Sequence, residues 1–560
     1  TSFGSKEFYS MEGAEYTIYS DEACTKEIEA LEIGEDGKSN VSQYLDIGTY
    51  YLKETVLPDC GNYEYDESVH PVEITANNVS RTPILITVMD NPVKGSLNIH
   101  KKLDPDEKDA IQQNRDLTKI RFSLTYKPNP DITIEDIQPD KDGNVHVDGL
   151  YFGTWILEET QGIDYHEMMD PVEIEISEDN DTAVEYDATN YRYNDRLVIQ
   201  KKDLDTGEII PLAGCEFQIK DEVGELVALK LEGYSEKTDT FKTNELGTVN
   251  FDEKIPAGKY TLEEITAPDG YGLADPVEFE VTGKEADSTA TVVMSDKRVT
   301  TGIAVEKKDA VSGNAAGAGF TFNIVADENI TDPAGNTYKG FEANAVVDTI
   351  TTDEKGVASS NVELYPGRYH IEETGVAQNY LNDAEDIPFE VVQKKAEDGK
   401  WYAEVSDFEK NVITVKNNPV KRPIQVTKTD SESGNAAGAD FTFTITADKV
   451  VDGTGNVYKG FEKGTVIETI TTDGRGIATS KDLYCGTYII KETVRKQNYV
   501  LSTKEYPVTV SDEDKTSEPV KVTIKDEPLK KKIQVTKIDK VTGNHCGAGY
   551  KFQIVAAEDI

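Results

Sequence analysis

The chain has 560 residues, of which 37% are hydrophobic and 29% charged, and 105 acidic residues against 58 basic ones give it a net charge of −47. Such an acidic surface repels nucleic acid and anionic lipid, which argues against partners of either class. No apolar run approaches the ~20 residues that a membrane-spanning helix needs, so we expect no membrane insertion in this segment.

The sequence is an internal repeat. Its best-preserved copies are SGNAAGAGFTFNIVAD at 312–327 and SGNAAGADFTFTITAD at 433–448, followed by GNTYKGFE at 335–342 and GNVYKGFE at 455–462. Weaker copies divide the chain into modules at 1–94, 95–195, 196–299, 300–421 and 422–530, with a sixth begun at 531 and incomplete. Within each module, short alternating segments rich in Val, Ile, Thr, Tyr and Phe are separated by turn residues, which predicts an all-β sandwich or barrel.

From the second module onwards, each module opens with a predicted strand that carries a lysine in phase with two apolar residues. Leu97 and Ile99 point inward in the second module, and Lys101 has the same phase because side chains alternate along a strand. The equivalent lysines of the later modules are Lys201, Lys307, Lys428 and Lys537. Their neighbours at 102, 202 and 308 have the opposite phase, and the opening strand of the first module is missing.

Several modules contain a G-A-x-F-type strand, as GAEYTIY at 13–19 and GCEFQIK at 214–220, and a glycine turn follows. In one such turn Asp140, Asp142 and Asn144 alternate as calcium ligands can, but the spaced glycine and closing glutamate of a calcium loop are absent, so we predict a plain turn. Six histidines lack metal-ligand spacing, and neither a phosphate loop nor a G-x-S-x-G elbow occurs. We therefore predict that the chain is not an enzyme and has no cofactor and no metal.

The late and closing strands of each module also place polar residues in phase with the core. Tyr50 and Leu52 set the phase of the first late strand, and the glutamates that follow this phase in successive modules are Glu54, Glu159, Glu264, Glu373 and Glu492. The closing strands end in the same way on Asp90, Asn190, Asp296, Asn417 and Asp526. Each of these precedes the next module's lysine by 11 residues, as from 90 to 101 and from 526 to 537.

Burying a lysine, a glutamate and an Asn or Asp on inward faces costs several kcal/mol of folding free energy for each charge unless the charges are paired or neutralised. One interpretation is a buried ion pair with a hydrogen-bonding neighbour. The other is chemistry: burial lowers the pKa of a lysine and raises that of a glutamate, and a neutral amine is a nucleophile. The product would be an amide between the lysine Nζ and the Asn or Asp side chain, with the glutamate shuttling protons.

The opening K-x-D, as in Lys428-Thr429-Asp430, the G-A-x-F strand, the G-x-Y-x-L-x-E-T strand, the A-P-D-G-Y at 267–271 and the V-x-N-x-P at 415–419 together resemble the collagen-adhesin B-type (Cna B-type, prealbumin-like) domains of Gram-positive surface proteins. The resemblance covers nearly the whole chain and implies a tandem array of Ig-like β-sandwiches. It also implies autocatalytic isopeptide bonds Lys101–Asn190 with Glu159, Lys201–Asp296 with Glu264, Lys307–Asn417 with Glu373, and Lys428–Asp526 with Glu492. Glu54 and Asp90 lack a lysine in this segment, and Lys537 lacks its partners.

We expect the chain to be a stalk or adhesin segment of an extracellular protein that sortase anchors to the peptidoglycan of the cell wall. The missing leader and anchor signals do not bear on this, because we expect a longer parent. A pilus backbone subunit is one alternative. Binding of a host or matrix protein or glycan is another, for which the insertions at 325–350 and 446–470 are the best candidate surfaces.

Five cysteines in a chain of this length do not form a disulfide framework. Cys24 and Cys60 lie in one module, and the sequence leaves their pairing open. Cys215, Cys485 and Cys546 are each alone in their modules, and we predict that they are small buried residues. An extracellular protein of this composition needs a staple other than disulfides.

Overall fold

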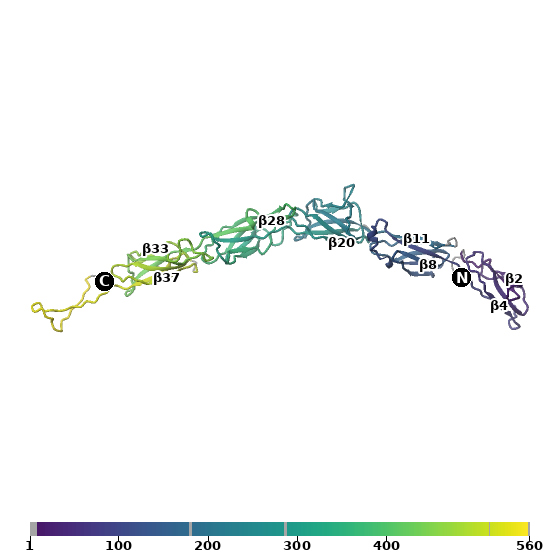
Figure 1. Ribbon diagram of the computed structural model, residues 1–560, viewed down its shortest axis with the longest axis horizontal. Helices are drawn as coiled ribbons and strands as arrows, with labels where there is room; N and C mark the ends of the chain where they lie inside the picture. The colour runs from purple at the N-terminus through teal and green to yellow at the C-terminus, as the bar shows by residue number, and fades with distance from the viewer. Residues whose placement is uncertain (1–7, 178–181, 285–287, 514–515, 558–560) are drawn as a thin grey trace. The chain divides into compact units, whose positions relative to one another are not determined.

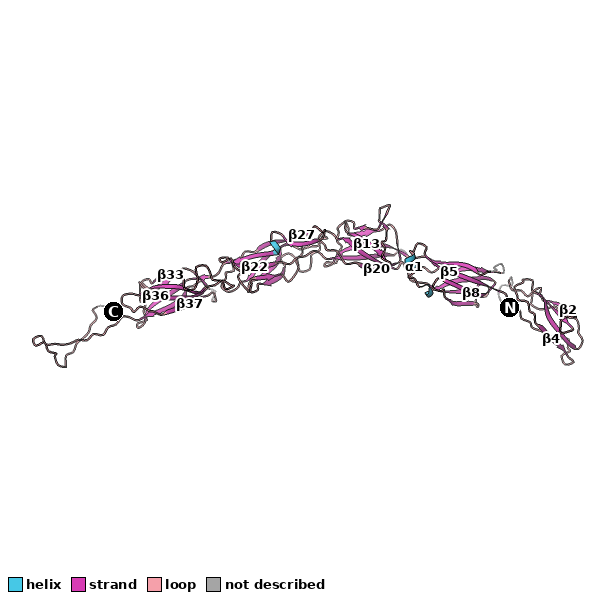
Figure 2. Ribbon diagram, viewed as in Figure 1, coloured by secondary structure: helices cyan, strands magenta, loops and turns pink. Residues whose placement is uncertain are grey.

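The computed structural model describes residues 8–177, 182–284, 288–513 and 516–557, and strands dominate them (Figure 2). Helix within these ranges is limited to one short α-helix, α1 (Asp109–Gln112), and two 3-10 turns, η1 (Leu117–Lys119) and η2 (Glu409–Asn411). None of the helices in these ranges is long and apolar enough to cross a membrane. The predicted all-β tandem array is confirmed, and the chain divides into two compact units, residues 1–297 and 298–560.

In the first unit, the second and third modules each pair two sheets around one core, and Figure 1 labels β8 and β11 of the second module. The strands of the second module are β5 (Lys94–Leu103), β6 (Arg121–Tyr126), β7 (Thr133–Ile137), β8 (Asn144–Tyr151), β9 (Gly153–Gln161), β10 (Val172–Ile176) and β11 (Val184–Asn190). Those of the third are β12 (Asn194–Asp203), β13 (Glu216–Asp221), β14 (Leu229–Lys230), β15 (Lys237–Thr238), β16 (Phe241–Lys242), β17 (Thr248–Asn250), β18 (Ile255–Pro256), β19 (Gly258–Thr266), β20 (Val277–Val281) and β21 (Thr289–Asp296).

In the second unit, the fourth and fifth modules have the same plan. The strands of the fourth are β22 (Ala304–Asp309), β23 (Thr321–Ala326), β24 (Val346–Thr351), β25 (Val357–Ser359), β26 (Gly367–Gly375), β27 (Ile387–Lys395), β28 (Trp401–Val405) and β29 (Val412–Asn417). Those of the fifth are β30 (Lys421–Arg422), β31 (Ile424–Asp430), β32 (Thr442–Lys449), β33 (Val466–Thr471), β34 (Ile477–Thr479), β35 (Leu483–Tyr484), β36 (Gly486–Val494), β37 (Glu505–Val510) and β38 (Val520–Asp526).

The opening and closing strands of each complete module lie side by side in one sheet and run parallel, in the pairs β5·β11, β12·β21, β22·β29 and β31·β38. The glutamate-bearing strands β9, β19, β26 and β36 belong to the other sheet, where each pairs antiparallel with the central strand. Alternation explains the core: along β5, Leu97 and Ile99 are fully buried while Asn98 between them is not. The two sheets thus direct one face each toward the same interior.

The first module differs from this plan. Its strands β1 (Glu15–Tyr19), β2 (Glu27–Glu32), β3 (Gly48–Val56) and β4 (Val69–Ile74) form a single sheet. The predicted closing strand that leads to Asp90 is wrong, because residues 81–90 form no strand, and Ile86 and Met89 in it are exposed. In every complete module the closing strand pairs beside an opening strand, and the described part of the first module, from Phe8 on, contains no opening strand. Residues 531–557 of the sixth module likewise contain no named strand.

Two smaller predictions can be compared with the structure. Asp140 makes a tight turn in which its Oδ1 accepts the backbone N–H groups of Asp142 at 2.9 Å and Asn144 at 2.8 Å. Cys24 and Cys60 are free thiols. Cys215 and Cys485 are buried as predicted, but that prediction is wrong for Cys546, which is partly exposed because no named strand of residues 531–557 packs over it.

A buried ionic network joins the second and third modules. The Glu107 carboxylate, whose side chain is fully buried, accepts hydrogen bonds from Arg115 at 2.9 Å and from His166 at 3.2 Å. Arg115 also reaches Glu222 of the third module at 2.7 Å, and Lys108 reaches Asp221 at 2.6 Å. Burial acts to raise the pKa of Glu107, but the bonds from His166 and Arg115 outweigh it and hold that pKa below its ordinary value.

We expect a Glu107→Gln variant to lose about 3 kcal/mol of stability at pH 7, because Arg115 keeps a buried charge without its main partner. The unfolded carboxyl titrates near ~4.3 and the folded one lower, so its stabilisation is present above ~4.3 and disappears as the pH falls through the folded pKa. Urea unfolding of the parent and the variant at pH 7 and at pH 3 measures the loss of stability and its dependence on pH. The exposed Glu225→Gln is the control, and an equal Glu107→Gln deficit at both pH values would contradict the assignment.

Candidate cross-linking site

The second module brings Lys101, Glu159 and Asn190 together at the centre of its sandwich. The Lys101 Nζ lies 3.1 Å from Glu159 Oε2 and donates a short hydrogen bond to Asn190 Oδ1. The Asn190 Nδ2 donates to the other glutamate oxygen, Oε1, at 2.8 Å. The three side chains therefore form a closed ring of contacts around the carboxamide carbon of Asn190.

The next three modules contain the same arrangement. Lys201 contacts Glu264 at 2.6 Å and makes a short ion pair with Asp296. In the fourth module the Nζ–Glu and Nζ–Asx oxygen distances are 2.7 Å and 2.5 Å, and in the fifth they are 2.8 Å and 2.5 Å; these sites comprise Lys307, Glu373 and Asn417, and Lys428, Glu492 and Asp526. We call these four clusters the triads.

Strand register explains why each triad assembles. In every complete module the residue opposite the lysine on the parallel closing strand lies two positions before the Asx, as Ala188 lies opposite Lys101 and Val415 opposite Lys307. Residues two apart share a face, so the Asx projects into the core diagonally ahead of the lysine. The glutamate reaches both from the facing sheet, and the triad connects the two layers.

All members of the triads are removed from water. Lys201, Lys307, Lys428 and Asn417 have no exposed surface, and the side chains of Glu159, Glu264 and Glu492 are likewise fully buried. Burial lowers the pKa of Lys101 and of Lys307, against the opposing effect of the neighbouring glutamates. The interior therefore favours the neutral amine, which is the nucleophilic form.

Burial acts on the acids in the complementary direction. It raises the pKa of Asp296 to about 7, although Lys201 opposes the shift, and Glu264 adds to it. Burial likewise raises the pKa of Glu492 against the effect of Lys428. A protonated carboxyl is the form that an amine can attack and that can donate a proton to a leaving group. Burial thus favours the protonated acid at Asp296 and at Glu492.

A phenylalanine that strand phase alone did not assign to the site packs against each triad. The Phe of the G-A-x-F strand lies directly opposite the glutamate, in the cross-strand pairs Phe122–Glu159, Phe217–Glu264, Phe322–Glu373 and Phe443–Glu492. Its ring centroid lies 5.6, 5.4, 5.5 and 5.4 Å from the lysine Nζ in the four modules. The ring covers the amine. Its spacing from the lysine varies (21, 16, 15 and 15 residues in the four modules), so the available signal was an aromatic residue in phase with the core on the central strand.

Two further contacts position the glutamates. A backbone N–H from the segment after the late strand binds Oε2, from Met169 to Glu159 at 3.0 Å and from Ala274 to Glu264 at 2.8 Å. In the third module the Cys215 thiol also donates to Glu264 Oε1 at 2.9 Å. Burial, followed by the charge of Glu264, raises the pKa of this thiol, so Cys215 stays protonated and acts as a donor.

The remaining predicted residues do not form triads. In the first module Glu54 is fully buried and accepts the N–H of Asp66 at 2.7 Å, and Asp90 accepts the Tyr16 hydroxyl at 3.0 Å. Lys537 lies exposed in residues 531–557. Among the lysines with the opposite phase, Lys102 forms a surface ion pair with Asp187, whose side chain is 57% exposed, so neither belongs to the buried site.

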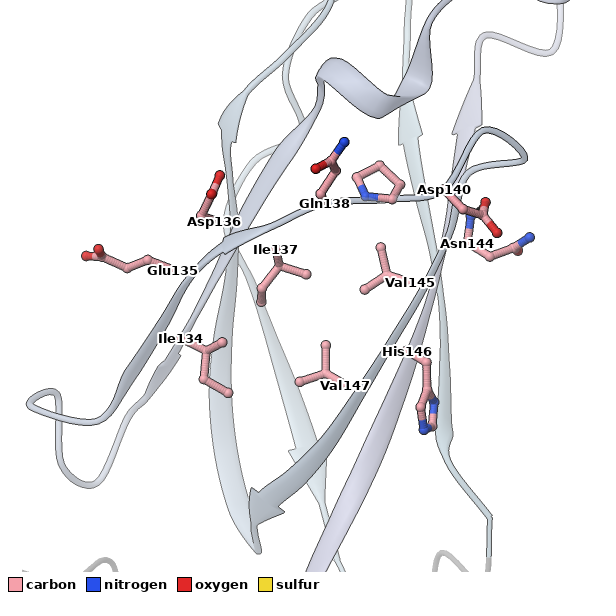
Figure 3. Close-up of a pocket in the computed structure, with 11 residues that line it drawn as sticks. Ile134, Glu135, Asp136, Ile137, Gln138, Asp140, Asn144, Val145, His146 and Val147 are labelled. Carbon is pink, nitrogen blue, oxygen red and sulfur yellow. Dashed lines mark hydrogen bonds between the residues drawn. The ribbon is translucent and has the colours of Figure 1, made fainter.

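A shallow groove in the second module lies apart from its triad. It is formed between β7 and β8, the edge strands of the two sheets, where Ile134 and Ile137 face Val145 and Val147 (Figure 3). Its lining contains neither the lysine, the glutamate nor the asparagine of the triad. The triad therefore lies in the closed interior of the module and outside this groove.

Comparisons with known proteins agree with this architecture. The model of the SpaA prealbumin-like fold domain matches the chain five times, at residues 4–85, 106–191, 195–298, 301–404 and 422–528. Among solved structures, the Bacillus anthracis TIE protein is 18% identical, with a TM-score of 0.35, over 87% of this chain and 72% of that one. A variant of BcpA, the major pilin subunit of Bacillus cereus, is 15% identical, with a TM-score of 0.24, over 60% and 99% of the two chains.

A streptococcal ancillary pilin is 13% identical, with a TM-score of 0.22, over 58% of this chain and 99% of the pilin. No curated protein matches the chain. The five matches of the domain model account for most of the sequence, in line with the resemblance to collagen-adhesin B-type modules. The chain belongs to the SpaA family of prealbumin-like fold domains, as a tandem of five of them.

Proposed function

We propose that this chain is a load-bearing stalk segment of an extracellular protein anchored to a Gram-positive cell wall, and that isopeptide bonds formed by its own side chains staple four of its modules. The observation that carries the proposal is the fourfold recurrence of a fully buried Lys–Glu–Asn/Asp triad in one strand register. Ion pairs alone give no reason for this repetition, because buried pairs add little net stability.

The reaction follows from the contacts. The neutral Lys Nζ adds to Cγ of the Asn or Asp, and the glutamate, hydrogen-bonded to both, moves a proton from the amine toward the leaving group. The C–N bond to the lysine forms, and ammonia leaves from Asn190 or Asn417, or water from Asp296 or Asp526. Each site reacts once and regenerates the glutamate, so this is maturation of the protein and not turnover of a substrate.

The mass of the intact protein tests the proposal. After denaturation and reduction we expect it to be about 70 Da below the sequence mass, because each asparagine site loses about 17 Da and each aspartate site about 18 Da. Replacing Glu159, Glu264, Glu373 and Glu492 one at a time by alanine is expected to restore one increment each. A mass equal to that of the sequence would reduce the triads to buried ion pairs.

A further inference from the structure

A loop of the fifth module, residues 450–462, docks on the end of the fourth module. Its Tyr458 hydroxyl donates to Asp309 Oδ2 at 2.6 Å, and the Tyr380 hydroxyl of the fourth module donates to the same oxygen at 3.0 Å. The backbone N–H of Gly453 donates to the Tyr380 hydroxyl at 3.1 Å. Asp309 is fully buried, and Tyr458 is only 4% exposed. We call residues 450–462 the plug, and Asp309 with Tyr380 the acceptor.

The contact extends along both loops. Asp452 of the plug accepts hydrogen bonds from Ser312 Oγ at 3.1 Å and Asn314 Nδ2 at 2.8 Å, and Thr454 Oγ1 donates to the Ala315 carbonyl at 3.1 Å. The other oxygen of Asp309 accepts the N–H groups of Val311 and Ser312, so the acceptor loop holds the carboxylate in place. The carboxylates of Asp309 and Asp452 therefore each accept several hydrogen bonds, which fix the orientation of the plug on the acceptor as well as holding it there.

The backbones also approach closely. A Cβ atom added at Gly453 would lie 1.8 Å from the Ala316 carbonyl oxygen across the junction. Only glycine fits at this position, and its φ is not one that requires glycine for another reason. A side chain at residue 453 would therefore push the two loops apart, and the surrounding hydrogen bonds between them would be lost.

Across the repeat, the acceptor of one module and the plug of the next module are present or absent together. The acceptor pair recurs as Asp203–Tyr271 and Asp430–Tyr499, and the plug tyrosine recurs as Tyr338 in GNTYKGFE. The second module carries Leu103 and His166 at the acceptor positions, and the third module, which follows it, has no YKGFE plug. Their junction uses Arg115, Lys108 and Glu107 in its place. Loss of the acceptor in one module thus coincides with loss of the plug in the next.

We propose that the plug is a coupling element that locks a module to the acceptor of the module before it, so that the fourth and fifth modules move as one rigid body. This role extends the stalk function and assigns the insertion at 446–470 to the chain itself, since its polar groups are engaged by the fourth module. The contacts involve none of the triads, so coupling and cross-linking are separable.

Distance measurements between spin labels on the full chain test the coupling. Labels are placed on cysteines introduced at the exposed positions Glu354 and Thr503, with the native Cys24, Cys60 and Cys546 replaced by serine. We expect one narrow distance distribution for the parent. Gly453→Ala is expected to abolish the narrow peak, whereas the matched Gly474→Ala, which adds its Cβ to open space in the same module, leaves the peak unchanged.

Tyr458→Phe gives a second, milder variant, which keeps the ring and removes only the hydroxyl on Asp309, and Tyr499→Phe is its control at the acceptor of the fifth module. We expect broadening for the first and none for the second. A broad distribution in the parent, or a narrow peak that survives Gly453→Ala, would overturn the proposal. The mass deficit is measured on the same samples, so failure of the coupling is distinguished from failure of the cross-links.

Discussion

A Lys307→Met variant is expected to melt its fourth module roughly 20 °C below the parent. The proposed bond from Lys307 to Asn417 would close a loop of 110 residues, and a cross-link over a loop of this size contributes about 4.7 kcal/mol by restricting the unfolded chain. In a domain of this size each kcal/mol shifts the melting temperature by roughly 4 °C. Lost packing adds little to this effect, because methionine keeps the apolar stem against Phe320 and Phe322.

The substitution also removes the cation that pairs with the buried Glu373 carboxyl, and this adds to the loss of stability. Without the amine, the Asn417 Nδ2 still donates to Glu373 Oε2 at 2.5 Å and to the Leu381 carbonyl at 2.7 Å. Lys308→Met is the matched control, since Lys308 is the next residue and forms only an ion pair with Glu306 at the surface. Calorimetry and intact mass are measured together. A Lys307→Met protein that melts with the parent would show that no bond constrains this module.

Alternation made much of the fold accessible from sequence. A strand such as 367–375 shows its buried face through Tyr369 and Ile371, and the same two-residue period points Glu373 toward the core. Side-chain phase is a local property, so one strand is enough to determine it. The sandwich class and the residues of each triad could therefore be predicted from the sequence alone, because every member lies on a regular strand.

Features that depend on a neighbouring strand or module could not be predicted from side-chain phase. Phase gave Asp90 an inward place on a closing strand, but a strand also needs a neighbour, and residues 81–90 have none beside them. The two-residue offset that sets Asn190 diagonally ahead of Lys101 is a property of parallel pairing, which phase does not specify. The K-x-D motif was visible in the sequence. In the fourth module, however, the contacts of its aspartate, Asp309, include Tyr458, which lies 149 residues away.

The largest mechanical effect is expected when a chain that carries Glu373→Ala is stretched by its two ends. In the parent, rupture of the fourth module should release almost no chain, whereas in the variant the 110 residues between Lys307 and Asn417 become extensible and add roughly 38 nm at ~3.5 Å each. Single-molecule force spectroscopy measures this increment directly. Glu372→Ala is the control, because Glu372 is adjacent on β26 but exposed. A 38 nm step in the parent would contradict the cross-link.

Strand direction explains why the bond removes the step. Tension enters the fourth module along β22 and leaves along β29, and the two strands are parallel neighbours, so pulling shears them past each other. Hydrogen bonds between them share this load only until the strands slip. The proposed covalent bond near the ends of both strands would pass the force from Lys307 to Asn417 and leave the residues between them unloaded. Because all four triads occupy this register, we expect the same path in each of the four complete modules, so that tension passes through these modules without unfolding them.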